Sequence, residues 1–258
     1  MANELSEPFE RMLERLFPPS RTRAIDAGGG WSEERDEIER SGFLDALVSK
    51  ADGGAGLSFT EVAPLFAALG RHAAPLAIGV AMIERASRDD NERVNAASLL
   101  HAAAIAGAAG RVLAMTVAHA NERVQFGKPV GRQQAVQQQL AVMAEETVAV
   151  RLAVELAANA GWPDMQRTAL AKTVASDAAP RISAVAHAVH GAIGIAAEHD
   201  LQLYTRRLHA WRIAEGSENL WARRLGADLI ASGERPVDYL RMVLFGESWP
   251  NVPLRGPR

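Results

Sequence analysis

Helical spacing of apolar residues dominates the pattern along this chain. Near the N-terminus, apolar residues separated by charged ones recur at intervals of three and four, at Leu5, Phe9, Met12, Leu13 and Leu16. This spacing puts the apolar side chains on one face of a helix. The period-two alternation that is typical of strands does not extend over useful lengths. The pattern therefore predicts an all-α protein.

Longer periodic stretches follow in the alanine-rich second half of the chain. We predict helices over about 97–122, 133–160, 164–194 and 218–232. Pro180 is expected at a kink or in a first turn of the third. Helices of this length with short connections are typical of an up-and-down four-helix bundle. The predicted organisation is an N-terminal helical domain (1–85), a linker (86–96), the bundle (97–235) and a tail (236–258), irregular over 248–258.

Start and stop signals support the helices of the N-terminal domain. Ser32 precedes a run of acidic residues, which favours a helix start, and Gly42 predicts its end. Ser58 and Glu61 have the spacing of a capping box. The glycine-rich stretch just before it, DGGAG, lacks the preceding strand, the lysine and the fixed glycine spacing of phosphate loops. We interpret that stretch as a turn and not as an anion site.

Composition and charge narrow the classes of function. The chain has 258 residues, enough for a substantial core, and no cysteine, which excludes disulfides and thiolate catalysis. A formal net charge of -3 provides no basic footprint for nucleic acid. The N-terminus lacks a signal-peptide pattern, and no run approaches eighteen consecutive strongly apolar residues. The sequence predicts a cytoplasmic protein that binds neither nucleic acid nor a membrane.

Two groups of polar residues are candidates for chemistry. His187 and His190 are three residues apart, but no third ligand follows at a defined spacing, so we expect no metal site. Gly216 lets the chain turn, Ser217 can cap the next helix, and Glu215 lies just outside that helix. Glu215 is either an acid that complements the helix dipole or a general base presented from a turn. Spacing alone favours the dipole role.

The segment RVQFGKPV (123–130) interrupts the helical pattern between two of the long helices. Gly127 and Pro129 shape this connection. Followed by Gln134, the segment resembles the signature of acyl-CoA dehydrogenases. In the same family order and spacing, 190–207 is similar to the glycine-rich segment and AEGSE (214–218) to the Glu-Gly-Thr motif. Residues 42–75 also resemble the family's N-terminal helical domain.

The resemblance implies an activity and a set of site residues. In the family, a glutamate removes a proton from Cα of an acyl-CoA thioester, a hydride leaves Cβ for FAD, and electrons pass to an electron-transfer flavoprotein. That base would be Glu215, in a water-poor pocket that raises its basicity. The motif arginine, here Arg123, would reach the FAD pyrophosphate of a neighbouring subunit. The other cofactor-binding positions implied are Gln125, Phe126, Gln134, Gly191 and Ser217.

The chain also departs from the family's pattern. Ala214 replaces the usual tyrosine before the base, and Ala188 replaces a cofactor-contacting glutamine. Ala192 replaces one glycine of a pair, and Arg207 replaces an aspartate. Only about residues 79–96 separate the N-terminal segment from the bundle, so the family's middle β-domain is absent. Because that domain covers one face of the flavin and forms part of the acyl-CoA pocket, this chain alone lacks half of a flavin site.

Three functions remain open from the sequence. In the favoured one, the chain is a subunit of a hetero-oligomer, and a full-length acyl-CoA dehydrogenase partner contributes the β-domain to a shared FAD and acyl-CoA site. The alternative is a non-catalytic interaction or scaffold protein that retains the bundle for oligomerisation. The last is a self-sufficient binder of FAD or an acyl-CoA. We expect self-association, because the family bundle packs against its copies.

Overall fold

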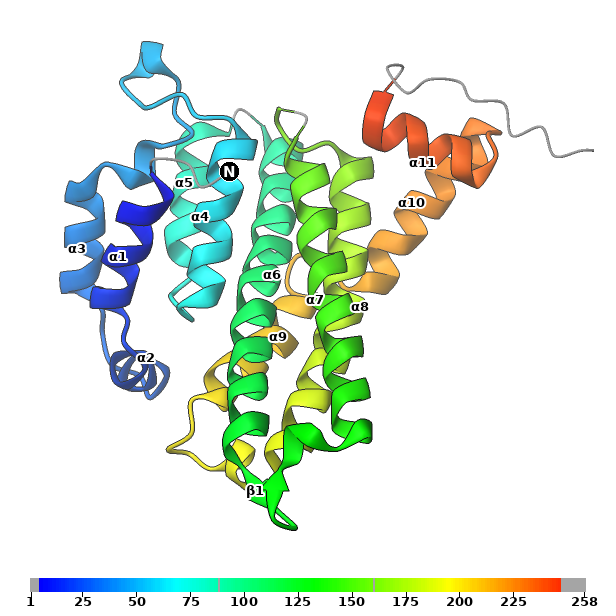
Figure 1. Cartoon of the computed structure of the whole chain (residues 1–258). Coiled ribbons are helices and arrows are strands. Elements are labelled where there is room, and N and C mark those ends of the chain that lie inside the picture. The colour runs from blue at the N-terminus through cyan, green and yellow to red at the C-terminus, as the bar shows by residue number, and fades with distance from the viewer. Residues whose placement is uncertain (1–4, 88, 160, 247–258) are drawn as a thin grey trace, which may run out of the picture.

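The computed structural model describes residues 5–87, 89–159 and 161–246 (Figure 1). Within these residues the fold is all-α, as predicted, apart from one two-stranded hairpin. The helices are α1 (Ser6–Leu16), α2 (Pro19–Asp26), α3 (Ser32–Ser41), α4 (Phe59–Arg71), α5 (Ala77–Ala86), α6 (Asp90–Glu122), α7 (Gln134–Ala158), α8 (Met165–His190), α9 (Leu201–Ile213), α10 (Glu218–Ser232) and α11 (Pro236–Phe245). The hairpin strands are β1 (Val124–Gln125) and β2 (Lys128–Pro129). Short 3-10 turns lie at Phe43–Asp45, Lys50–Asp52, Val130–Arg132 and Gly191–Ile195.

The predicted helix signals of the N-terminal segment are present in the structure. Gly42 ends α3 in the left-handed region, at φ +78°. Glu61 accepts a hydrogen bond of 2.8 Å from the backbone N–H of Ser58, and both halves of the capping box are formed at the start of α4. These caps satisfy backbone groups that would otherwise be unpaired at the helix ends.

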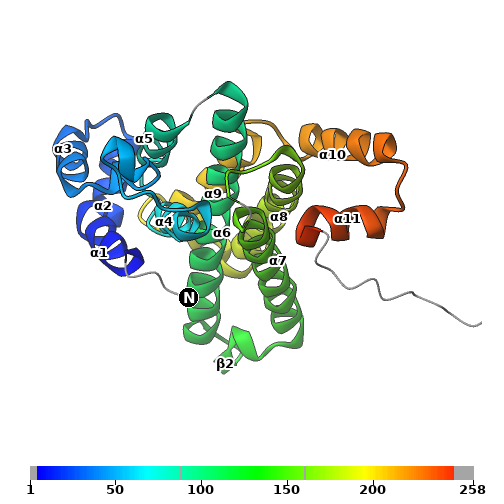
Figure 2. The ribbon, with the colours of Figure 1, turned by 90° about the horizontal axis from the view of Figure 1, so that it is seen from above.

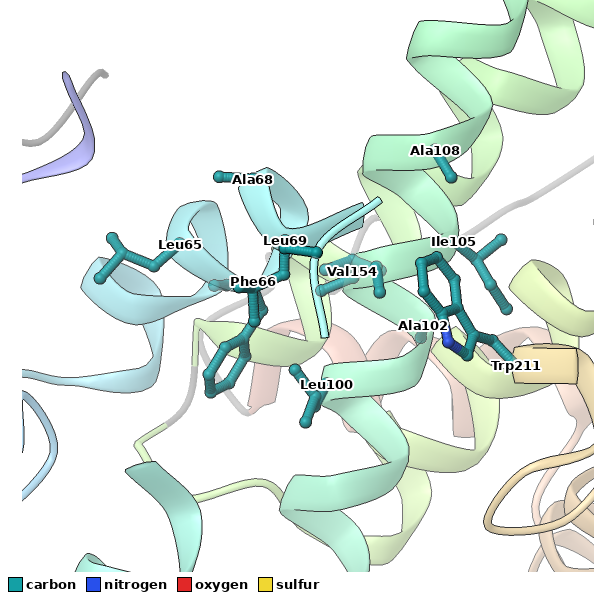
Figure 3. Close-up of a cluster of buried hydrophobic side chains, with 14 of the residues drawn as sticks. Leu65, Phe66, Ala68, Leu69, Leu100, Ala102, Ile105, Ala108, Val154 and Trp211 are labelled. Atoms are coloured by element: carbon teal, nitrogen blue, oxygen red, sulfur yellow. The ribbon is translucent and has the colours of Figure 1, made fainter. Parts of the chain in front are cut away.

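Close backbone approach joins α4 to α6. A Cβ added to Gly107 of α6 would lie 1.8 Å from the carbonyl oxygen of Ala67, and one added to Gly70 of α4 would lie 1.9 Å from that of Ala104. Only glycine permits this separation at both positions. The contact brings Phe66 and Leu69 of α4 into the same core as the bundle helices (Figure 3). Packing is therefore continuous across the boundary predicted between the two helical segments.

The bundle consists of α6, α7 and α8, with α9 packed against α6 and α8 (Figure 1). The fourth helix of the bundle is thus α9 and not the predicted 218–232, which is α10. Four side chains of α9 are buried at helical spacing, namely Leu201, Tyr204, Leu208 and Trp211. In contrast, α10 packs mainly on α8, and of its residues only Trp221 is buried. Pro180 lies inside α8, which continues through it as one helix.

The part of the predicted tail that the structure describes is helical. Pro236 stands in the first turn of α11, where its missing N–H is not needed. Tyr239 is 1% exposed and donates a hydrogen bond of 2.6 Å to Asp228 of α10. Helices α10 and α11 lie on the side of the bundle opposite α1–α5 (Figure 2). The irregular stretch predicted for 248–258 lies outside the described residues.

Helix α6 is long and apolar enough to cross a membrane, with a mean hydropathy of 1.4 in its best window. However, 61% of that window is buried inside the fold. Its alanine-rich surface packs against α4, α7, α8 and α9, so its apolar character is explained by its place as the core helix.

Residues 87–89 alone connect α5 to α6. In the described residues the hairpin is the whole of the β-structure, and it follows α6 instead of preceding it. No sheet domain is therefore inserted between the N-terminal helices and the bundle, as the sequence predicts.

Candidate cofactor-binding and catalytic site

The segment that interrupts the helical pattern folds as a tight hairpin between α6 and α7. Val124 pairs with Pro129 and Gln125 with Lys128. The two residues at the tip, Phe126 and Gly127, have φ of +51° and +76°. Positive φ at both central residues is the geometry of a two-residue turn that matches the strand twist.

Phe126 is unusual in both backbone and exposure. Positive φ is unfavourable for a bulky L-residue, and a large apolar side chain is rarely fully in water. Phe126 is 93% exposed at the hairpin tip. Backbone strain held at an exposed aromatic residue marks a candidate contact position for another molecule.

A cavity of about 390 Å³ lies at the end of the bundle beside this hairpin. It brings together three of the predicted cofactor residues, Arg123, Gln125 and Gly191. Arg123 and Gln125 follow the C-terminal end of α6, and Gly191 follows that of α8. Among the described residues, the guanidinium of Arg123 makes no hydrogen bond or ion pair, so its donors are available to a ligand. Gly191 turns the chain at φ +64° directly after α8. The cavity thus combines a free cation with a sharp backbone turn.

The amide side chains of this cavity match the predicted ones only in part, because Gln125 lines it and Gln134 does not. Gln134 is the exposed first residue of α7 and does not line the cavity. Gln133 and Gln139 line it instead. Gln133 lies immediately before α7 and has an extended backbone. Its side chain therefore does not follow the helical spacing from which the prediction was made. His119 and His190 also line the cavity and were not predicted as its members.

Glu215 and Ser217 lie elsewhere, in the turn between α9 and α10. Glu215 has a φ of +53° and an exposed side chain, and its carbonyl oxygen accepts a hydrogen bond of 2.9 Å from the Trp221 indole. Gly216 follows at φ +99°. Ser217 is the N-cap residue of α10 by its backbone, but its hydroxyl makes no capping bond within the described residues. The turn therefore presents a carboxylate from a strained backbone position and leaves a hydroxyl beside it.

A buried lysine holds the helix end that leads into this turn. Lys172 of α8 is 0% exposed, and its Nζ donates to the carbonyl oxygens of Trp211 at 2.6 Å and Arg212 at 3.0 Å. These carbonyls belong to the last turn of α9, where they have no partner within the helix. Burial lowers the pKa of Lys172 to about 8, and the charge of Glu215 partly opposes that shift. Lys172 thus links the core to the position of Glu215.

The first turn of α10 carries a second acid with a different role. Glu218 accepts a hydrogen bond of 3.0 Å from Arg212 Nε, and this partner lowers the pKa of Glu218. His101 of α6 lies nearby, and burial lowers its pKa, which favours its neutral form. Glu218 is therefore an ion-paired carboxylate, and Glu215 is the acid of this turn that remains exposed.

The residues present fit one end of a flavin dinucleotide. A planar guanidinium with free donors suits a pyrophosphate. The described residues contain no sheet that covers a flavin ring, so the fit extends to the phosphate end of the cofactor. Three or more side chains in a metal-binding arrangement do not occur in the part of the chain that the structure describes.

The chain has recognisable relatives. It is 37% identical over 141 residues to the acyl-CoA dehydrogenase IpdE2 of Mycolicibacterium smegmatis, covering 55% of this chain and 45% of that protein. It is 40% identical over 113 residues to IpdE2 of Mycobacterium tuberculosis, covering 44% and 35%. The chain thus spans less than half of the length of these curated relatives.

Solved structures share the whole fold. The ChsE4–ChsE5 complex from Mycobacterium tuberculosis matches with a TM-score of 0.76 at 17% identity, covering 91% of this chain and 98% of that chain. The family profile "Acyl-CoA dehydrogenase, C-terminal domain" matches residues 89–230, which is more than half of the sequence. This match includes Arg123, Gly191 and Glu215. The chain belongs to the acyl-CoA dehydrogenase family, as a shortened member that lacks the middle β-domain.

Proposed function

We propose that this chain is a subunit of an FAD-dependent acyl-CoA dehydrogenase assembly and contributes to a shared site for α,β-dehydrogenation of an acyl-CoA thioester. The convergence of Arg123, Gln125 and Gly191 on one cavity carries the proposal. Gly191 is far in sequence from Arg123 and Gln125, and the resemblance implies a cofactor contact at each of the three.

Each residue of the chain has a defined part in this proposal. Arg123 donates charge-assisted hydrogen bonds to the pyrophosphate of FAD, and Phe126 packs beside that cofactor across a subunit boundary. When bound, FAD supplies the acceptor for the hydride from Cβ. The Glu215 carboxylate accepts the proton from Cα. Exposed in the lone chain, Glu215 gains basicity once a partner excludes water from the turn.

The assembly needs a second kind of subunit. Because this chain has no β-domain, a full-length acyl-CoA dehydrogenase partner covers the flavin and completes the acyl-CoA pocket. The ChsE4–ChsE5 structure is a precedent for this fold in a complex. The assembly also contains copies of this chain, works in the cytoplasm and passes electrons to an electron-transfer flavoprotein.

A non-catalytic scaffold is the second candidate, and the outer helices favour it. Ile230 of α10 and both Val237 and Met242 of α11 are 83%, 56% and 51% exposed. Exposed apolar side chains on neighbouring helices are typical of interaction surfaces. In this alternative the bundle is retained only to assemble with a dehydrogenase.

Substitution in the native complex separates the two candidates. We expect Glu215→Gln, which keeps shape and removes basicity, to reduce acyl-CoA dehydrogenation by at least about a hundredfold, while the complex and its flavin content persist. Arg123→Ala should instead lower the flavin content. Glu145→Gln and Arg151→Ala, both exposed on α7, are matched controls that should change neither.

The measurements are flavin absorbance per complex and the rate of reduction of an artificial electron acceptor. Full activity in Glu215→Gln would exclude Glu215 as the base and leave the scaffold function as the better account. Unchanged flavin in Arg123→Ala would remove the proposed cofactor contact.

A further inference from the structure

Three histidines form a compact cluster near Arg123, and two of them, His119 and His190, line the cavity. The rings of His119 and His190 are stacked, with centroids 4.4 Å apart and an interplanar angle of 21°. His199 packs against His190 in an edge-to-face arrangement, with centroids 5.0 Å apart and an interplanar angle of 71°. His119 lies one helical turn before Arg123 on α6, and His190 is the last residue of α8. Helix ends that are distant in sequence thus bring imidazoles and a guanidinium to one cavity.

The hydrogen bonds of His190 fix which ring nitrogen is free. Its Nδ1 lies 2.8 Å from the carbonyl oxygen of Ala186. A carbonyl only accepts, so Nδ1 carries the proton, and Nε2 of the neutral ring is a lone-pair acceptor. This Nε2 is buried and has no hydrogen-bond partner among the described residues. His190 is only 6% exposed, so water does not readily satisfy it.

The charged surroundings keep this cluster neutral in the absence of an anion. Burial lowers the pKa of both His119 and His190, and their mutual proximity and His199 lower it further. Arg123 on α6 acts in the same direction on His119, and Glu122 opposes it. On α8, His187 adds to the effect on His190, and the pKa of His187 is itself lowered by burial and by His209 of α9. Burial and the neighbouring imidazoles therefore disfavour a positive charge on these rings.

A phosphate in the cavity would instead favour a protonated imidazole. Two stacked imidazolium ions at this separation would repel strongly, so the pair accepts one proton and not two. A bound dianion beside Arg123 compensates that one charge. Protonation also converts an imidazole nitrogen from an acceptor into a donor, which is the form that a phosphate oxygen requires.

We propose that the cluster of His119, His190 and His199 is a proton-coupled subsite for the phosphates of a nucleoside diphosphate, next to Arg123. The ligand class rests on the function proposed above; the histidines and the coupled proton are additional to it. On binding, the imidazole of His119, the less buried ring of the stacked pair, takes a proton from water and donates the new N–H to the ligand, and the proton returns to water on release. Affinity therefore rises as pH falls.

Calorimetric titration of the purified chain, and of its native complex, with ADP and then FAD at pH 6 and pH 8 tests this proposal. We expect about tenfold tighter binding at pH 6, the linkage of one proton whose pKa rises into this range. Titration in two buffers of different ionisation enthalpy should show uptake of about one proton per ligand.

Substitutions assign the proton to the cluster. His119→Phe keeps a stacking ring and removes the titrating nitrogen, so its affinity at pH 6 should fall to the pH 8 value. His209→Gln, on the exposed side of α9, should retain the pH dependence of the native chain. Circular dichroism confirms that each variant is folded. Imidazole NMR shifts of the unsubstituted chain provide a second measurement, in which ADP should raise the midpoint of a cluster ring.

The possible outcomes distinguish failure of the histidine subsite from failure of the proposed function on which it rests. Binding that needs Arg123 but is equally tight at both pH values, without proton uptake, overturns the histidine subsite and leaves the proposed function standing. Binding of neither ADP nor FAD by the chain or its complex overturns the cofactor site itself, and the subsite with it.

Discussion

Single residues in this chain combine burial or strain with a position next to the proposed chemistry. Lys172 is the clearest case, because a buried ammonium is costly unless its hydrogen bonds are satisfied. Here it donates to two carbonyls at the end of α9 and lies 3.2 Å from the Ser176 hydroxyl. Lys172 thus satisfies two carbonyls that would be unpaired at the helix end, but it does so by burying a positive charge. The cost of burying this charge should make the free energy of unfolding depend on pH.

We predict that the free energy of unfolding rises between about pH 8 and pH 10.5, relative to that of Lys172→Met. Burial holds the folded-state pKa at about 8, below the usual 10.5, so the unfolded chain binds more protons at this site within that window. Below pH 8 both states are protonated, and the difference is constant. The full rise is at most about 3 kcal/mol.

Urea denaturation of the two proteins at pH 7, 8 and 10 measures this effect, since groups common to both cancel in the comparison. Parallel dependence on pH in the two proteins would mean that Lys172 titrates normally. The same variant should also increase amide exchange at residues 214–216, where the turn loses its anchor.

Helices pair in this fold through close backbone contact, and the α4–α6 crossing depends on it. In most helix interiors, replacing glycine by alanine stabilises, because the unfolded chain loses entropy. Gly107 is an exception, since its added methyl would overlap the carbonyl of Ala67. Gly110, one turn further along α6, has no described atom within 4 Å of the added Cβ.

We therefore expect opposite effects from two equivalent substitutions in one helix. Gly107→Ala should lower the free energy of unfolding by about 2 kcal/mol or more, because α4 must move away from α6. Gly110→Ala should raise it by up to about 1 kcal/mol. Thermal or urea unfolding of both variants decides the matter. Equal effects of the two would show that the helices are not in backbone contact.

At the scale of the whole molecule, the residues that the structure describes form a helical body without a domain that covers a flavin. We predict that the chain purified alone from a foreign host carries no stoichiometric flavin, whereas its complex purified from its own host does. Visible absorbance of each preparation, with mass determination of the complex, is the measurement. A full flavin band in the lone chain would contradict the need for a partner. The absence of flavin from both would favour the scaffold function.

The sequence predicts the elements of this fold better than their packing. Strong periodicity and caps gave the long helices and the end of α3 at Gly42, and the family motif drew attention to Arg123. Helix α9 was missed because it is short and lies between a glycine-rich segment and the Glu215 turn. Helix α11 was missed because only Tyr239 and Val243 of this helix are buried, and Tyr239 is stabilised by Asp228 of another helix.

The candidate site was predictable only where a motif carried it. Arg123, Gln125 and Gly191, which the resemblance singles out, line one cavity, but His119 and Lys172 have no local signature. Their surroundings are set by α8 and α9, which come from distant parts of the chain. Such contacts depend on tertiary packing, which spacing along a single helix does not encode.

The connection of residues 87–89 between α5 and α6 has a consequence for how such proteins are built. Both helices are anchored by their own packing, α5 on α6 and on the turn at Phe43–Asp45, so neither relies on the link for its position. A foreign domain whose own ends lie close together can therefore be placed there without altering the core. The connection is therefore a suitable site for circular permutation or for insertion of a reporter domain. A protein that gained or lost a domain at this point would keep the same helical scaffold.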